Sequence, residues 1–294
     1  MEEKVYYVGQ DREIKSLTGL FLKLADDDTE KTIYIDEGVY DIFNEYKELG
    51  VESPSDDVKA GDYFSYNIFL PLNTKLIGIG NVYLKFSPEP NDITYGESVT
   101  WAPLNVLGKC HIENIAIYCK NGRYCIHDDC HNKYQNVSHY YKNVRCVYEK
   151  GDIKDGKLLG FNNTIGFGFG QGCKFEFENC SFEFLGEGNH SAFYGHEAGR
   201  ENPENAPTIL VKNCKIVADE DSDRAVRLQS LAVADLRVFT HFEACQIHGG
   251  LYLTILHDNS SQHFDVILKN CENPSLKIDK EEQNRYPVKM INDN

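Results

Sequence analysis

Short runs in which apolar and polar residues alternate recur along the chain and predict β-strands. The clearest example is CKFEFENCSFEF at residues 173–184, in which 174–177 and 181–184 alternate on either side of Asn179. Because successive side chains of a strand point to opposite faces, we expect the phenylalanines to lie inside and the glutamates outside. The pattern therefore predicts two short strands joined at a bend.

The same pattern returns in five other segments, which begin at residues 110, 139, 209, 240 and 266. Alignment on the bend gives one column of residues: Asn114, Asn143, Asn179, Asn213, Ala244 and Asn270. The steps between them are 29, 36, 34, 31 and 26 residues. A unit of this size that repeats with variable insertions is typical of a solenoid.

Asparagine suits a bend because its amide can hydrogen-bond to turn backbone and because it tolerates the left-handed conformation. Ala244 interrupts the column, so we expect a weaker or reshaped bend there. Cysteine follows the column residue at 180, 214, 245 and 271. This position indicates buried, reduced thiols stacked from coil to coil, and not a disulfide framework.

Further strands are expected between the bent segments, at 123–127, 165–169, 192–196, 225–229 and 251–255. Each coil then offers at least two strands, and each strand stacks in parallel on its counterpart in the next coil. The fold class predicted is all-β, a parallel β-helix.

The N-terminus adds a strand at 5–8 and an amphipathic helix at 11–25, with Asp11 as its expected cap. Such a helix could cover the open first coil of a solenoid. The polar stretches 44–66 and 86–101 are expected to be loops.

The helix is followed by KTIYIDEGVYDI at 31–42 and later by LIGIGNVYLKF at 76–86. This order resembles the opening coils of the pectin-lyase-like superfamily, which includes pectate lyases, polygalacturonases, pectin methylesterases and phage tail spikes. The resemblance implies a right-handed parallel β-helix with an N-terminal capping helix. We expect one domain over 1–294, with strand and cap at 1–30, coils at 31–280 and a tail at 281–294.

Composition narrows the choice of partner. The formal charge of −16 disfavours nucleic acid and anionic membranes, and weighs mildly against a polyanionic glycan unless cations bridge it. The first residues lack a signal-peptide pattern and no transmembrane span is visible, so we expect synthesis in a cytoplasm. The many tyrosines could stack on sugar faces.

Three clusters could carry chemistry, at 121–131, 188–200 and 221–230. In the first, Ile126 is expected to point inward, and Cys125 and His127 outward. We expect His127, His196 and Arg227 to line one outer flank of stacked strands. The candidate catalytic residues are His127, Asp128, Asp129, His196, Glu197 and Arg227, and the candidate substrate-binding residues are Arg123, Tyr124, Tyr194, Arg200 and Gln229. The alternative is that these are solvated polar side chains on turns and an exposed sheet.

No cofactor is required by the sequence. A calcium or magnesium ion could bind the paired carboxylates of Asp128 and Asp129. The HDDCH stretch at 127–131 also places His and Cys close together, so zinc remains an alternative although the stretch lacks a CxxC motif. A weaker site is conceivable at His257-Asp258.

None of the catalytic motifs of the resembled enzymes is matched residue by residue. His127-Asp128-Asp129 has paired aspartates without the glycine of the polygalacturonase motif, and Arg200 and Arg227 lack the pectate lyase context. We therefore expect a glycan-recognising protein of a phage or prophage tail or other surface appendage, with a homotrimer on a virion as the assembly that this role implies. The alternatives are a polysaccharide lyase, glycoside hydrolase or carbohydrate esterase, and a purely structural spacer.

Overall fold

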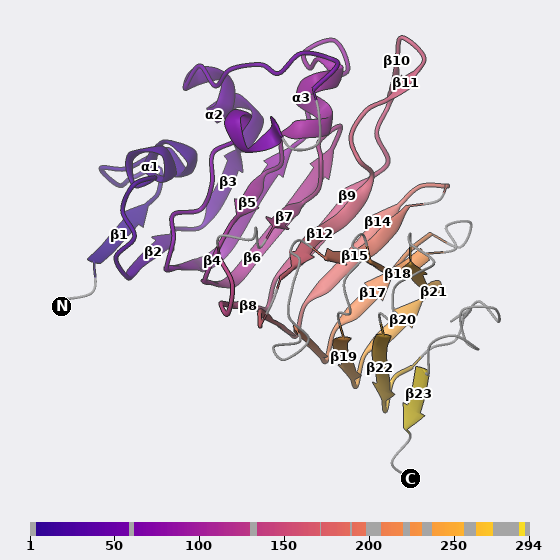
Figure 1. The fold of residues 1–294 in the computed structure, drawn as a ribbon. Helices are drawn as coiled ribbons and strands as arrows, with labels where there is room; N and C mark the ends of the chain where they lie inside the picture. Colours follow the sequence, from indigo (N-terminus) through magenta and orange to yellow (C-terminus); the bar gives the residue numbers. More distant parts are fainter. Residues whose placement is uncertain are drawn as a thin grey trace.

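The computed structural model describes residues 4–58, 62–129, 134–170, 172–188, 190–197, 207–219, 224–230, 237–255, 263–272 and 288–291. Almost all of its strands pair in parallel with strands of neighbouring coils, which confirms the predicted right-handed parallel β-helix. The two termini lie at opposite ends of the coil stack (Figure 1).

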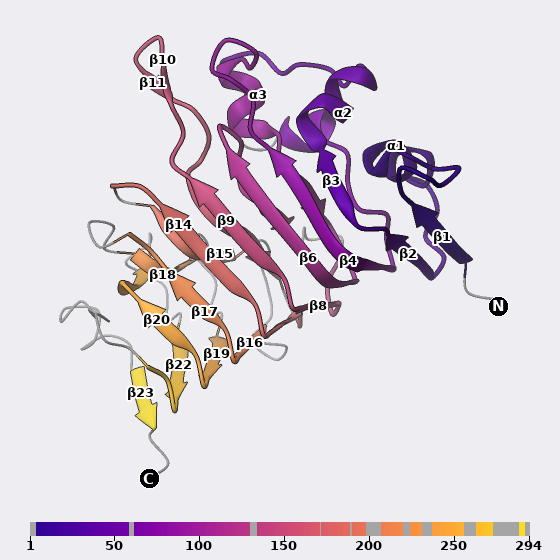
Figure 2. The same cartoon turned by 180° about the vertical axis from the view of Figure 1, so that it is seen from behind.

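The strands form three stacks that run along the helix axis. The first stack contains β1 (Lys4–Val8), β2 (Lys31–Ile35), β8 (Ser138–Lys142), β13 (Lys174–Glu178), β16 (Thr208–Lys212), β19 (Arg237–Glu243), β22 (His263–Lys269) and β23 (Val288–Ile291). The second contains β3 (Gly38–Asp41), β9 (Arg145–Glu149), β14 (Ser181–Leu185), β17 (Lys215–Val217) and β20 (Gln246–His248). Two long strands, β4 (Thr74–Phe86) and β6 (Cys110–Lys120), belong to both stacks, which Figure 2 shows from behind.

The third stack is a separate six-stranded sheet. It contains β5 (Leu104–Val106), β7 (Ile126–Asp129), β12 (Asn163–Phe169), β15 (Ser191–Glu197), β18 (Arg224–Ser230) and β21 (Gly250–Ile255). Strands β12, β15, β18 and β21 confirm the strands predicted at 165–169, 192–196, 225–229 and 251–255. The strand predicted at 123–127 overlaps β7 only at 126–127, and β5 was not predicted. A small hairpin of β10 (Ile153–Lys154) and β11 (Lys157–Leu158) follows β9 in the chain and projects away from the stacked strands (Figure 1).

The bend between the first and second stacks is the asparagine column. All six column residues have left-handed φ angles between 52° and 59°. Ala244 has a φ of 52°, and its N–H donates to the Lys269 carbonyl at 2.9 Å, just as Asn213 donates to Glu243 at 2.9 Å. The expected reshaping at Ala244 is therefore wrong, because the backbone bonds of the neighbouring coils impose the same bend on alanine.

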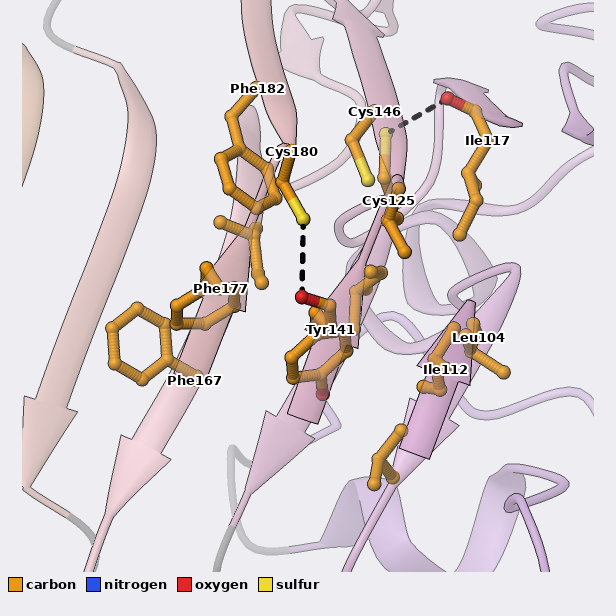
Figure 3. Close-up of a cluster of buried hydrophobic side chains, with 14 of the residues drawn as sticks. Leu104, Ile112, Ile117, Cys125, Tyr141, Cys146, Phe167, Phe177, Cys180 and Phe182 are labelled. Carbon is orange, nitrogen blue, oxygen red and sulfur yellow. Dashed lines mark hydrogen bonds between the residues drawn. The ribbon is translucent and has the colours of Figure 1, made fainter. Parts of the chain in front are cut away.

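Aromatic side chains stack from coil to coil inside the helix. Tyr141 lies parallel to Phe177 with ring centroids 4.9 Å apart, and Tyr148 lies parallel to Phe184 at 5.7 Å. Figure 3 shows Cys180 in the same core, pointing at the carbonyl of Tyr141. The nine cysteines that the structure describes are free, and all but Cys271 are buried, as the column of thiols predicted.

Three short helices lie at the N-terminal end, and the sequence placed them poorly. The first, α1 (Leu17–Lys23), is capped by Ser16 and not by Asp11, because residues after Gly9 turn back to pair Ile14 with Val8. The expected loop at 44–66 contains α2 (Ile42–Glu48) and the 3₁₀ helix η1 (Asp62–Tyr66). The expected loop at 86–101 contains α3 (Tyr95–Thr100). None of the described helices is long and apolar enough to cross a membrane.

Candidate functional site

The outer face of the third stack carries two columns of chemically active side chains. In-register pairing aligns His127 of β7 with Gly166, Tyr194 and Arg227 of the following strands. The neighbouring column, two residues further along each strand, aligns Asp129 with Gly168, His196 and Gln229. His127, His196 and Arg227 thus share one face, as expected, but they occupy two columns and not a single row.

Strand β7 directs its side chains alternately outward and inward. Asp128 points into the coil, where His139 Nδ1 lies 2.8 Å from its Oδ2, whereas Asp129 points outward and accepts from the Tyr63 hydroxyl at 3.3 Å. The two carboxylates lie on opposite sides of the strand, so they cannot chelate one calcium or magnesium ion together. The predicted outward orientation of Cys125 is wrong, because regular alternation begins only at Ile126 and the Cys125 thiol donates to the Val147 carbonyl at 3.2 Å.

Aromatic rings enclose the β7 end of this face. The Tyr63 ring, contributed by η1, lies 4.5 Å from the His127 ring, and the Tyr124 ring lies 5.2 Å from it on another side. The Arg123 guanidinium lies over Phe161 at 4.3 Å and over Tyr63 at 4.9 Å. Arg123, Tyr124 and His127 are accordingly buried.

The β15 and β18 end of the face is more open. The Tyr194 hydroxyl donates to Gln229 Oε1 at 3.2 Å, and the Arg227 guanidinium lies over the Tyr194 ring at 5.2 Å. Tyr194, His196 and Arg227 are each partly exposed, as is Asp129 at the other end. We call the whole set the outer-face site, which comprises Tyr63, Arg123, Tyr124, His127, Asp129, Tyr194, His196, Arg227 and Gln229.

Several polar atoms of the outer-face site are buried without a hydrogen-bond partner. They are Arg123 Nε, His127 Nδ1, Asp129 Oδ1 and Arg227 Nε. A buried polar atom without a partner costs about 1–3 kcal/mol, so atoms of this kind that gather on one face of a folded protein are commonly satisfied by water, an ion or a ligand.

Burial also shifts the titration of these groups. Burial, reinforced by the charge of Arg123 and by His196, lowers the pKa of His127 well below its usual range, so the ring is neutral near pH 7. Burial raises the pKa of Tyr124 to about 12 and also raises that of Tyr194. Burial lowers the pKa of Arg227, although two tyrosines oppose the shift.

Four predicted residues cannot be assessed in the same way. The backbone of Glu197 ends β15, but its side chain lies outside the described part of the structure, as do Arg200 and the pair His257-Asp258. Tyr63 and Phe161 join the face although sequence reasoning did not select them. Tyr63 lies in a segment taken for a loop, and no periodic signal marked it.

Asp128 belongs to a second cluster, inside the coil. Its carboxylate accepts from the Tyr141 hydroxyl and pairs with His139 Nδ1, and the Cys110 thiol lies 3.8 Å from the same nitrogen. Cys110, His139 and Tyr141 were not among the predicted residues. The bend alignment could have found part of this cluster, because Cys110 and His139 each lie four residues before a column asparagine and pair in register.

The fold resembles that of several solved enzymes. Pectin methylesterase from carrot matches with a TM-score of 0.41 and 11% identity over 97% of this chain and 91% of that one. Pectin methylesterase from Aspergillus niger, in its deglycosylated form, matches with a TM-score of 0.38 and 12% identity over 93% and 87% of the two chains. At these values the likeness concerns the course of the chain and not its chemistry.

No protein-family model matches the chain, and no curated protein sequence does. The strand pairing described above shows a right-handed parallel β-helix, which is the architecture that the sequence resemblance implied.

Proposed function

We propose that this β-helix binds a polysaccharide along the outer-face site and acts on it as a polysaccharide-directed enzyme. The observation that carries the proposal is the set of unpartnered polar atoms on Arg123, His127, Asp129 and Arg227, held between aromatic rings on one face. Sugar hydroxyls and carboxyl or ester groups can satisfy such atoms, and tyrosine rings offer faces on which pyranose rings stack.

The proposed roles follow from the chemistry of each group. Asp129 has one oxygen bonded to Tyr63 and the other unpartnered, so it can serve as a general base or a nucleophile toward a bound sugar. Arg227, the cation at the open end, would bind an anionic or ester oxygen of the substrate and stabilise charge that develops there. The neutral His127 ring would accept or donate one hydrogen bond to the bound substrate.

Turnover of soluble polysaccharides tests the proposal. A panel of neutral, acidic and esterified glycans is incubated with the protein, and new reducing ends, unsaturated products and released acid or alcohol are measured. We expect one of these products, and we expect Asp129→Asn to lower its rate by a factor of about 100 or more. Asn keeps the shape and the Tyr63 contact, and Glu113→Gln on the first stack is the matched carboxylate control.

Glycan recognition without turnover is the second candidate, which one observation favours. Asp129 is the only carboxylate of the outer-face site whose side chain the structure describes, whereas glycoside hydrolysis commonly needs two. This reading would suit a protein of a surface appendage or virion. It predicts measurable binding by calorimetry that Tyr194→Ala weakens, with no product from any glycan of the panel.

A further inference from the structure

The cluster inside the coil joins donor atoms from three strands. Cys110 of β6 and His139 of β8 stack in the first stack, and Asp128 of β7 approaches them from the third stack across the interior. One ligand atom from each of the three lies within 4.8 Å of the other two. The Tyr141 hydroxyl of β8 lies 3.9 Å from the Cys110 sulfur and donates to Asp128.

This donor set matches the preferences of zinc. Zinc binds thiolate sulfur at about 2.3 Å and imidazole nitrogen at about 2.0–2.1 Å in a tetrahedral arrangement, which places the two donors roughly 3.6 Å apart. The observed separation of Cys110 Sγ and His139 Nδ1 is 3.8 Å. The Asp128–His139 separation of 2.8 Å is that of a hydrogen bond, and it would widen by about half an ångström around an ion.

The cluster is incompletely satisfied without a ligand. Asp128 Oδ1, the second oxygen of the donor carboxylate, is buried without a hydrogen-bond partner, and the side chains of Asp128 and His139 are fully shielded from solvent. The Asp128 carboxylate faces His139 Nδ1 and the Cys110 sulfur in a space shielded from solvent, where its negative charge would stabilise a bound cation.

We propose that Cys110, Asp128 and His139, with the Tyr141 hydroxyl as fourth donor, form a structural zinc site inside the β-helix. Zinc would bind Cys110 as the thiolate and His139 through the Nδ1 lone pair of the neutral imidazole, so the thiol proton, and any proton on Nδ1, would leave to solvent as Zn²⁺ enters. Thiolate and imidazole donors favour zinc over calcium or magnesium, which prefer oxygen ligands.

An entry route exists beside the cluster. A surface cavity of about 290 Å³ is lined by Cys110 together with Thr74, Ser138 and Tyr140. Cys110 is 5% exposed whereas Asp128 and His139 are fully buried, so Cys110 is the residue of the cluster that lies nearest to solvent.

The proposed ion would also fix the strand that carries the outer-face site. Asp128 lies between His127 and Asp129 on β7, so a bond that holds Asp128 inward sets the direction in which its two neighbours point. The zinc site does not depend on what the outer face binds, and its test needs no substrate.

Metal analysis of the purified full chain tests the proposal. We expect about one zinc per chain by elemental analysis. After removal by a chelator, titration of the apoprotein with Co²⁺ should give thiolate-to-cobalt charge-transfer absorption with a stoichiometry of one. Cys110→Ser should abolish that absorption, and both Cys110→Ser and His139→Gln should weaken zinc binding by more than about tenfold.

Cys146→Ser is the matched control, because Cys146 is an equally buried free thiol outside the cluster, and it should keep both the cobalt spectrum and the zinc stoichiometry. The cobalt titration of the wild-type chain does not depend on whether any variant folds. A wild-type chain that binds neither zinc nor cobalt, and whose melting temperature is unchanged by chelator, would overturn the proposal and leave a buried Asp128–His139 hydrogen bond only.

Discussion

At each bend, one residue per coil must adopt the left-handed backbone conformation, which few residue types tolerate. Five of the six column positions meet it with asparagine, and Asn143 also donates its side-chain amide to the Asn114 side-chain oxygen at 2.9 Å. Ala244 adopts the same conformation without an amide, so its Cβ is crowded by backbone without compensation. The same backbone conformation recurs at this position in every coil and favours asparagine there, so the column could be found by aligning the repeats.

Substitution at the bend should change stability in opposite directions at two equivalent positions. We expect Ala244→Asn to raise the free energy of unfolding by about 0.5–1 kcal/mol, because asparagine tolerates the left-handed region better than alanine does. Asn213→Ala should lower it by a similar amount. Thermal and urea unfolding of the two variants measure both changes, and a loss of stability in Ala244→Asn would contradict the argument.

For single residues, alternation in the sequence predicted which side chains of β15 and β18 face outward. It did not predict which side chains from elsewhere in the chain pack over the outer face. Alternation along β15 and β18 places Tyr194, Arg227 and Gln229 outside, as the two columns confirm. The cover over His127 comes from Tyr63, some 60 residues earlier. Its position depends on how a long excursion packs back onto the coil, and no local pattern encodes that.

Among the strands of the outer-face site, β12 differs because it presents glycines where its neighbours present side chains. Gly166 lies between His127 and Tyr194, and Gly168 lies between Asp129 and His196. The Tyr124 ring occupies the space above Gly166, so close that an added Cβ would lie 2.6 Å from its Cε2. The glycine therefore determines where one aromatic wall of the outer-face site stands.

Gly166→Ala should displace the Tyr124 ring and so weaken polysaccharide binding, at a stability cost of about 1–3 kcal/mol. Gly195→Ala on β15 is the matched control. Its Cβ would crowd the Phe167 ring at 2.7 Å on the inner face of the same sheet, so a similar loss of stability should leave affinity unchanged. Calorimetric titration with the glycan found to bind, together with melting temperatures, separates the two effects. Equal affinities in both variants would show that Tyr124 does not shape the outer-face site.

The short helices show where prediction at the level of elements fails. In α3, Thr94 and Glu97 form a capping box, but the helix spans only six residues, too few for a periodic pattern in the sequence. The buried face of α2 consists of Ile42, Phe43 and Tyr46. The strands were recovered because the same pattern recurs in every coil, whereas each helix occurs once.

In the molecule as a whole, each coil pairs with the coils next to it, and the ends need separate protection. At the N-terminal end α1 lies beside β1 and β2 (Figures 1 and 2) and buries Leu17, Leu20 and Phe21. Stability in such a stack is the sum of coil and interface contributions, so damage at one end need not spread to the other. The cluster proposed to bind zinc lies on β6, β7 and β8, further along the stack than β1 and β2.

Removal of the Phe21 ring should therefore unfold the first coils selectively. Phe21 is 2% exposed, so Phe21→Ala is expected to cost about 3–5 kcal/mol, whereas Leu22→Ala, at a position 53% exposed, should cost less than about 0.5 kcal/mol. Because neighbouring coils are coupled only locally, hydrogen exchange in Phe21→Ala should accelerate in β1 and β2 and remain slow in β13 and β16. Equal acceleration along all four strands would show instead that the stack unfolds as one cooperative unit, and that α1 stabilises every coil and not only the first.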